Sequence, residues 1–149
     1  MNFFSRLSIK PRSAGFTLVE LAVVVVIIGV LAAFAVPRFM DSVERSKAAE
    51  AYNYLSTIHS AQERFHARQG EYSTDLTKLD VKLTTPTYFT VGTVDVPATA
   101  SSIETGWELT LTRTGAAAGY GAYTVIFNED GFDKTNSTIP DSINPFQTP

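Results

Sequence analysis

One carboxylate, Glu20, lies at the start of the most apolar stretch of the chain. From Leu21 to Val36 the sequence contains no charged residue and is built from Val, Ile, Leu, Ala and Phe, with a single glycine, Gly29. A charge in a bilayer costs about 2.5–3.5 kcal/mol near the centre and less near an end. Glu20 is therefore a candidate functional group, and the chemistry it offers is neutralisation of a cation in an apolar environment.

The element that must position Glu20 is a membrane-spanning helix. Residues 16–37 include about the 20 mostly apolar residues that such a helix needs, and Pro37, which lacks a backbone donor, should kink or break it. The preceding segment contains basic residues and no acidic residue, so the positive-inside rule places the N-terminus in the cytoplasm. The basic residues are Arg6, Lys10 and Arg12.

The run Gly15-Phe16-Thr17-Leu18-Val19-Glu20 resembles the processing site of type IV pilins and their pseudopilin relatives. The resemblance implies that a prepilin peptidase cuts after Gly15 and methylates the new N-terminal Phe16. Residues 1–15 would then be a leader peptide that is removed.

The resemblance extends through the apolar helix, and it covers roughly the first third of the chain. It implies that Glu20 guides the assembly of subunits into a filament. Gly29 in the middle of the helix and Pro37 near its end match the family as well. The resemblance implies that the interval between them can lose helical order in the filament.

A cut after Gly15 would create an α-amino group on Phe16, which is cationic below its pKa of about 7.7–8.0. A cation and a carboxylate about 4 Å apart interact by about 4 kcal/mol at an effective dielectric constant of 20. That is enough in scale to offset the burial of Glu20. Glu20 could meet the amine of its own chain, because residues four apart share a helix face, or that of a neighbouring subunit. The residues alone leave both geometries open, and the resemblance implies the second.

Two other interpretations also account for a basic start and an apolar run. A secretory signal peptide would be cut at Ala33-Phe34-Ala35 and would release a soluble chain beginning at Val36. An uncleaved anchor would keep the whole segment. Neither explains why Gly15, Phe16 and Glu20 occur together.

Composition limits the rest of the chain to one modest domain. The chain has 149 residues, a net charge of -3 and no cysteine. Loss of residues 1–15 would change the net charge from -3 to -6, which argues against non-specific nucleic-acid binding, and no specific nucleic acid is predicted. Without a disulfide, the C-terminal region must be closed by packing, hydrogen bonds or a metal.

Residues 38–69 predict an amphipathic continuation of the helix, with Gly70 as its stop. A helix from Phe16 to Gln69 would be about 80 Å long at 1.5 Å per residue, too long for a small domain to cover. Its first half must be buried in lipid and later, we infer, against other copies. The expected apolar side carries Met40, Val43, Ala51, Leu55, Ile58, Ala61 and Phe65, and the expected polar side carries Asp41, Glu44, Arg45, Lys47, Glu50, Arg64 and Arg68.

Residues 70–149 predict a C-terminal head, so the fold class is α+β: a long N-terminal α-helix packed on a small antiparallel β-sheet of three or four strands. Tyr72, Leu76 and Leu79 should fold a short turn back onto the helix. The apolar face of Trp107, Leu109 and Leu111 should pack on Leu55 and Ile58. The expected strands are 87–96, 107–113 and 123–128, with a hairpin loop at 114–121.

Four oxygen-bearing side chains in the tail could hold calcium, but the same run is an ordinary turn after a strand, and we favour the turn. They are Asn128, Glu129, Asp130 and Asp133. His59 and His66 share a helix face without a set of metal-binding partners, and we interpret them as solvated or interface residues. We expect no catalytic constellation, no resident cofactor and no enzyme activity.

The sequence therefore predicts the structural subunit of a type IV pilus-like filament that supports adhesion, motility or DNA uptake. Its expected partners are further copies of itself, the prepilin peptidase, an assembly ATPase and an inner-membrane platform. The precursor would span the inner membrane once, and the assembled pilus would lie on the cell surface. The alternatives are a pseudopilin of a type II secretion system and a membrane-anchored or secreted binding domain.

Overall fold

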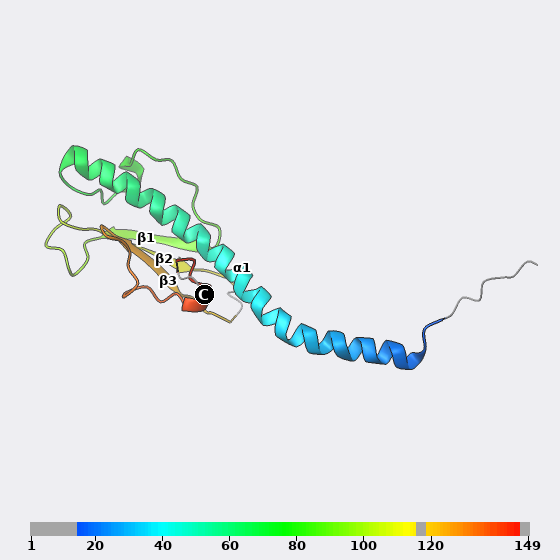
Figure 1. The fold of residues 1–149 in the computed structure, drawn as a ribbon. Coiled ribbons are helices and arrows are strands. Elements are labelled where there is room, and N and C mark those ends of the chain that lie inside the picture. Colours follow the sequence, from blue (N-terminus) through cyan, green and yellow to red (C-terminus); the bar gives the residue numbers. More distant parts are fainter. Residues whose placement is uncertain (1–14, 116–118, 147–149) are drawn as a thin grey trace, which may run out of the picture. The chain divides into compact units, whose positions relative to one another are not determined.

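A computed structural model describes residues 15–115 and 119–146. The predicted leader lies outside these residues except for Gly15, and Ala116–Ala118 of the predicted hairpin loop also lie outside them. The chain divides into two compact units, residues 1–37 and 38–149. One helix, α1 (Leu18–Gln69), runs through both units (Figure 1), so Pro37 does not break it.

Both ends of α1 are set by local sequence. Thr17 precedes the first helical residue, and its side chain accepts the backbone N–H of Glu20 at 3.2 Å. At the other end, Gly70 adopts φ +80°, a conformation that glycine reaches without a steric penalty. The Gly70 N–H closes the last turn on the His66 carbonyl at 2.8 Å. The predicted stop at Gly70 is confirmed.

The predicted antiparallel sheet is confirmed, and in the part of the chain that the structure describes it has four strands in the order β1-β2-β3-β4. The strands are β1 (Phe89–Asp95), β2 (Glu108–Arg113), β3 (Thr124–Asn128) and the short β4 (Gly131–Phe132). The register of β1 on β2 shifts between Val91 and Val94, which marks a bulge in β1. Figure 1 shows β1 to β3 beside the later half of α1, within the second unit.

The core of the second unit lies between α1 and one face of the sheet. Leu55 and Ile58 on the helix and Trp107, Leu109 and Leu111 on the sheet are each at most 2% exposed. This is the predicted pairing of faces. Alternation along β2 and β3 buries every second residue, as expected for a sheet with one packed face.

The predicted polar side of α1 is wrong at Glu44, which is fully buried. The buried residues of α1 include Glu44, Ala48, Ala51, Leu55, Ile58 and Gln62. Their spacing alternates between four and three residues, which is the repeat of one helix face. Glu44 and Gln62 are in phase with the core, whereas Met40 and Val43, assigned to the apolar side, are 39% and 38% exposed.

The segment after α1 folds back onto the helix, as predicted. Gln62 exchanges two hydrogen bonds of 2.8 Å with the backbone of Ser73, which satisfies a buried amide. A single 3-10 turn, η1 (Leu76–Lys78), follows and is capped by Asp75. Tyr72 and Leu79 on either side are buried in the core.

The C-terminal tail is closed by hydrogen bonds and aromatic packing. Ser137 and Thr138 bond to the outer edge of β3, and the 3-10 turn η2 (Asp141–Ile143) follows. The Tyr52 hydroxyl donates to Asn144 at 2.9 Å. Tyr52 also contacts the rings of Phe127, Phe132 and Phe146.

Candidate assembly site and surface patches

Glu20 forms a reciprocal cap with Thr17 at the first turn of α1. One carboxylate oxygen, Oε2, accepts the Thr17 backbone N–H at 2.8 Å and the Thr17 hydroxyl at 2.7 Å, and the Thr17 hydroxyl accepts the Glu20 N–H. This is a capping box, Thr-x-x-Glu. The other oxygen, Oε1, makes no hydrogen bond within residues 15–115 and 119–146, so the carboxylate keeps a free acceptor.

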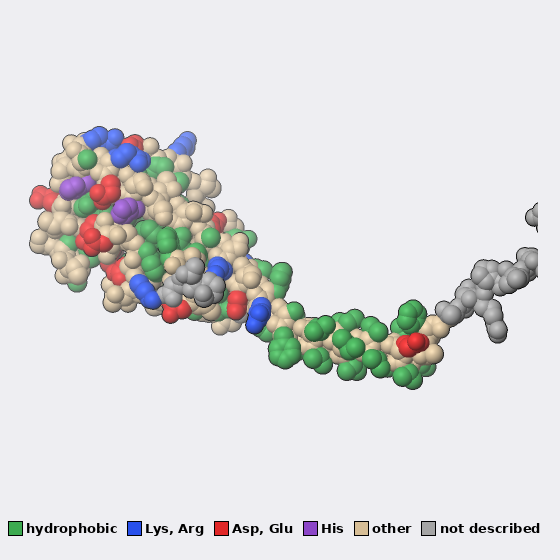
Figure 2. Space-filling model, in the orientation of Figure 1, with side chains coloured by type: hydrophobic (Ala, Val, Ile, Leu, Met, Phe, Trp, Pro, Cys, Tyr) green, Lys and Arg blue, Asp and Glu red, His purple; other side chains and the backbone are tan. Residues whose placement is uncertain are grey.

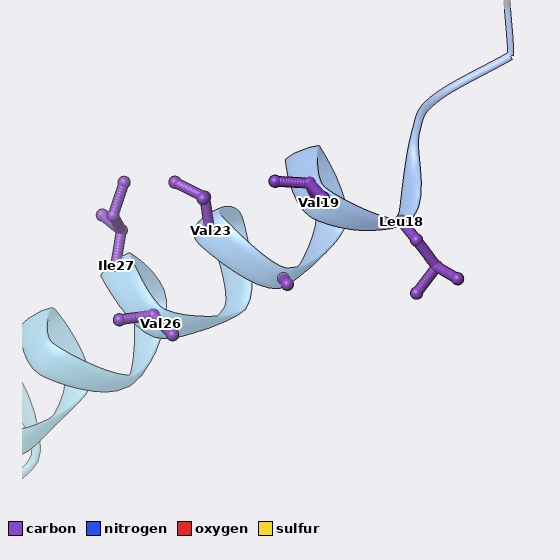
Figure 3. Close-up of a pocket in the computed structure, with 6 residues that line it drawn as sticks. Leu18, Val19, Val23, Val26 and Ile27 are labelled. Atoms are coloured by element: carbon purple, nitrogen blue, oxygen red, sulfur yellow. The ribbon is translucent and has the colours of Figure 1, made fainter.

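The surface around Glu20 is apolar and uncovered. Figure 3 shows Leu18, Val19, Val23, Val26 and Ile27 projecting from the helix. Exposed fractions of the large hydrophobic side chains in this unit run from 46% to 85%. An apolar surface this continuous needs lipid or protein to cover it, and α1 contains a stretch long and apolar enough to cross a membrane.

The other predicted assembly and processing residues lie along the same unit. Gly15 lies in extended chain before α1, and the neighbouring Phe16 is 77% exposed. Gly29 lies within α1, and a Cβ atom added to it would meet no atom within 4 Å. Pro37 lies inside α1 at the end of the unit. Gly29 therefore has space on its helix face for the close approach of another chain.

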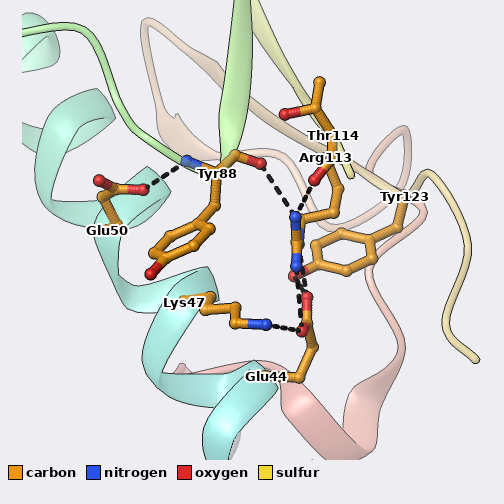
Figure 4. Close-up of polar contacts among 7 residues, drawn as sticks. All are labelled: Glu44, Lys47, Glu50, Tyr88, Arg113, Thr114 and Tyr123. Carbon is orange, nitrogen blue, oxygen red and sulfur yellow. Dashed lines mark hydrogen bonds and ion pairs between the residues drawn. The ribbon is translucent and has the colours of Figure 1, made fainter. Parts of the chain in front are cut away.

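A buried ion pair in the second unit joins α1 to β2 (Figure 4). The Arg113 Nε lies 2.5 Å from Glu44 Oε1, and the two side chains are 1% and 0% exposed. The Tyr123 hydroxyl donates to the same oxygen at 3.0 Å, and Lys47 reaches the other one at 3.3 Å. Burial alone would raise the pKa of Glu44, but the bonds from Arg113, Tyr123 and Lys47 outweigh it, so the pKa is lowered.

A cluster of cations, here called the basic patch, surrounds the end of α1 and the turn η1. It consists of Arg64, Arg68, Lys78 and Lys82, with two carboxylates, Asp80 and the η1 cap Asp75. Asp80 lies 2.7 Å from Arg64 and 3.2 Å from Arg68. The hydrogen bond from Arg64 is the main reason that the pKa of Asp80 falls to about 2. Lys78 and Lys82 flank Asp80 and are exposed.

A group of four carboxylates, here called the acidic patch, surrounds Tyr72 and the two histidines. His66 stacks on Tyr72 with ring centroids 4.3 Å apart, and its Nε2 lies 3.1 Å from the Glu104 carbonyl oxygen. His59 Nε2 lies 3.0 Å from the Glu129 carbonyl oxygen. Both histidines therefore contact backbone. The patch consists of Glu63, Glu104, Glu129 and Asp130.

Burial and the carboxylates of the acidic patch raise the pKa of Tyr72. Its hydroxyl donates to Glu63 Oε1 at 3.2 Å. Burial and then the negative charges of Glu63, Glu129 and Asp130 raise the pKa of Tyr72 to about 12. The patch therefore has a local negative potential.

The residues considered for calcium form a turn, which is the favoured interpretation of this segment. Asn128 caps the Asp130 N–H at 3.0 Å, and Asp133 accepts three bonds from Thr135 and Asn136. The Glu129 carboxylate accepts the Trp107 N–H at 3.2 Å. Among the described residues, no three His, Asp or Glu side chains form a group that could hold a metal.

Two features of the structure have a signal in the sequence but were not predicted from it. The Thr17-x-x-Glu20 spacing before an apolar run is the signature of a capping box, so Glu20 has a helix-capping role besides any role for its charge. The position of Glu44 in the core repeat indicated that a buried cation had to lie opposite it. Nothing in the helix sequence identified that cation as Arg113.

The fold and these surfaces define a class of protein in which a long helix exposes an apolar first half and carries an α+β head on its second half. Two family descriptions match the chain. Residues 10–36 match the prokaryotic N-terminal methylation motif, and residues 37–124 match the type IV minor pilin ComP, DNA uptake sequence receptor. The second match spans more than half of the chain. The chain belongs to the type IV pilin family.

Individual relatives are similar over a shorter stretch. The type IV major pilin protein PilA of Myxococcus xanthus is 48% identical over 64 residues, 43% of this chain and 29% of that protein. Fimbrial protein EcpC of Eikenella corrodens is 39% identical over 67 residues, 45% of this chain and 44% of that protein.

The type IV narrow pilus major component PilA5 of Thermus thermophilus is 48% identical over 50 residues, 34% of this chain and 43% of that protein. These matches cover less than half the length of each of the three relatives. No solved structure matches the chain.

Proposed function

We propose that this chain is a structural subunit of a type IV pilus. The observation that carries the proposal is the uncovered apolar half of α1 with Glu20 at its first turn, in a chain of the pilin family. The precursor spans the inner membrane once with its N-terminus in the cytoplasm. The assembled subunit leaves lipid and buries the same surface against copies of itself.

Processing prepares the subunit for assembly. The prepilin peptidase cuts after Gly15 and methylates Phe16, and an assembly ATPase with its inner-membrane platform drives polymerisation. Glu20 Oε1, which the capping box leaves free, receives the amine of a neighbouring Phe16. This pairing neutralises both charges in the filament core.

Gly29 and Pro37 supply a weak interval in the helix. Glycine lowers helix propensity by about 1 kcal/mol relative to alanine, and proline removes a backbone hydrogen bond. We infer that residues 29–37 loosen during packing into the filament. Hydrogen exchange in filaments tests this: amides of residues 29–37 should exchange faster than those on either side, and equal protection contradicts it.

The test of the filament role is a shear preparation from cells that express the chain, followed by electron microscopy and immunolabelling. Long labelled fibres on the cell surface support the pilus role. A Gly15→Val variant, which places bulk at the cut, should give uncut precursor and no fibres. Short fibres confined to the periplasm, together with a secretion defect in the deletion strain, would identify a pseudopilin instead.

DNA uptake is a second candidate function. The match of residues 37–124 to a family described as a DNA uptake sequence receptor favours it, and the basic patch supplies cations for phosphate contacts. DNA binding by isolated filaments should weaken as salt rises and should fall for Lys78→Glu/Lys82→Glu. If filaments of this variant bind DNA at low salt as tightly as filaments of the original chain, the basic patch does not contact DNA.

A further inference from the structure

The basic and acidic patches lie on different sides of the end of α1. At about 100° per residue, Arg64 and Arg68 lie roughly 100–180° around the helix from His59, Glu63 and His66. Figure 2 shows Lys and Arg side chains gathered along the upper edge of the second unit, with both histidines and several Asp and Glu side chains below them. The unit therefore presents two surfaces of opposite sign.

The two patches are opposite in charge and accessible. Four cations and two carboxylates give the basic patch a formal charge of +2, and four carboxylates give the acidic patch a formal charge of -4 with neutral histidines. Lys78, Lys82, Glu63, Glu104 and Asp130 are all exposed. None of these five residues lies in the core that packs α1 on the sheet.

We propose that the basic patch of one subunit docks on the acidic patch of the next copy in the filament. A contact between two different patches of the same chain is heterologous, and repetition of such a contact that does not close generates an open helical assembly. Complementary charge fixes the register of an interface and disfavours like-charged contacts. The apolar helices supply the filament core, and the charged contact sets how neighbouring heads meet.

This inference rests on the proposed filament role and adds a second, independent contact to it. The copy is favoured over other partners because the complementary surface is present on the same chain. It also makes a prediction that the apolar core does not. Reversal of the charges in both patches should restore the filament yield that reversal of either patch alone removes.

The experiment reverses each patch separately and then both together in full-length chain. Arg68→Glu/Lys78→Glu/Lys82→Glu gives the basic patch a negative charge, and Arg64 keeps its contact with Asp80. Glu63→Lys/Glu104→Lys/Asp130→Lys gives the acidic patch a positive charge, and Glu129 keeps its bond to Trp107. Lys134→Glu/Asp141→Lys is the control, because this exposed pair, 3.9 Å apart, lies outside both patches.

Each triple variant should reduce the yield of sheared filaments by about 10-fold or more, since like charges across an interface cost several kcal/mol. The filament yield of the combined variant should recover to within about 2- to 3-fold of that of the original chain. The yield of the control variant should equal that of the original chain. Processed N-termini and unchanged Trp107 fluorescence in detergent verify that each variant is cut and folded.

Normal filament yield from either folded triple variant overturns the docking proposal, and so does a folded combined variant that fails to recover. Loss of DNA binding with an unchanged filament yield in the basic-patch variant assigns that patch to DNA instead. Absence of filaments from the original chain contradicts the pilus role, so the failures of the two proposals are distinguishable.

Discussion

Glu44 on α1 and Arg113 at the end of β2 form an ion pair of 2.5 Å with both side chains buried. The Arg113 guanidinium also donates to the backbone carbonyls of Tyr88 and Thr114. The pair therefore connects the helix, the strand β2 and the segment that enters β1. A charge pair in this position fixes the register of the sheet on the helix, because any shift would separate two opposite charges that are both buried.

Removal of either charge should destabilise the second unit. Glu44→Gln and Arg113→Gln should each lower the free energy of unfolding by about 3–5 kcal/mol, since each removes the closest opposite charge of a buried group. The double variant should cost less than the sum of the two, with a coupling of about 0.5–3 kcal/mol.

Urea unfolding of the full-length chain in detergent measures this cycle through Trp107, the single tryptophan. The exposed pair Lys134 and Asp141 is the matched control, and its coupling should not exceed about 1 kcal/mol. Additive losses at Glu44 and Arg113 would show that the two side chains do not stabilise each other.

Stability should fall in acid through two carboxylates. The pKa of Glu44 is lowered from 4.5, and the pKa of Asp80 is lowered from 3.8 to about 2. A lowered pKa stabilises the folded state above the unfolded pKa, and this stabilisation is lost as pH falls through the folded value. The free energy of unfolding should therefore decline below about pH 4.5.

The same urea titration between pH 7 and pH 2 measures the decline. Asp80→Asn should flatten the curve between about pH 3.8 and pH 2, and Glu44→Gln should flatten it at pH values below about 4.5. A curve that has the same slope in both variants and in the original chain would assign the acid sensitivity to other groups.

Gly92 should tolerate no side chain. A Cβ atom at Gly92 would lie 2.9 Å from the backbone carbonyl oxygen of Thr110, where β1 shifts its register on β2. Gly92→Ala should lower the free energy of unfolding by about 1–3 kcal/mol. The urea assay on the original chain and on the variant measures this loss. Equal stability of the two would mean that the strand relaxes without cost.

The capping role and the charge role of Glu20 can be separated by two variants. Glu20→Gln keeps a side chain suited to the capping box but removes the charge, so it should be inserted and cut yet yield at least about 10-fold fewer filaments. Thr17→Ala removes the cap at a cost of about 1 kcal/mol and keeps the charge, so it should assemble. Filament yield with immunoblots of the processed chain measures both. Normal assembly of Glu20→Gln with failure of Thr17→Ala would assign Glu20 to helix capping.

The spacing of apolar residues predicted most of the fold. The repeat of Ala51, Leu55 and Ile58 and the alternation of Trp107, Leu109 and Leu111 each identified a buried face, because one hydrophobic core selects both patterns. Glu44 was predicted to face solvent because it is charged, although its position in the helix repeat is in phase with the core. A buried charge is recognised only with its partner, and Arg113 lies 69 residues away in sequence.

The surfaces were less predictable than the core. The basic patch combines the end of α1 with Lys78 and Lys82 from the following loop, and the acidic patch combines Glu63 with residues on either side of Trp107. Sequence separation hides such groups until the fold brings them together. The processing residues Gly15 and Phe16 are the opposite case, since one short motif contains them both.

The most direct test of the account is mass spectrometry of the N-terminal peptide from membranes and sheared fibres. We expect a chain that begins at Phe16 and carries a methyl group on its α-amine. A chain that begins at Val36, or one that retains Met1 in both fractions, would contradict pilin processing and with it the assembly role of Glu20.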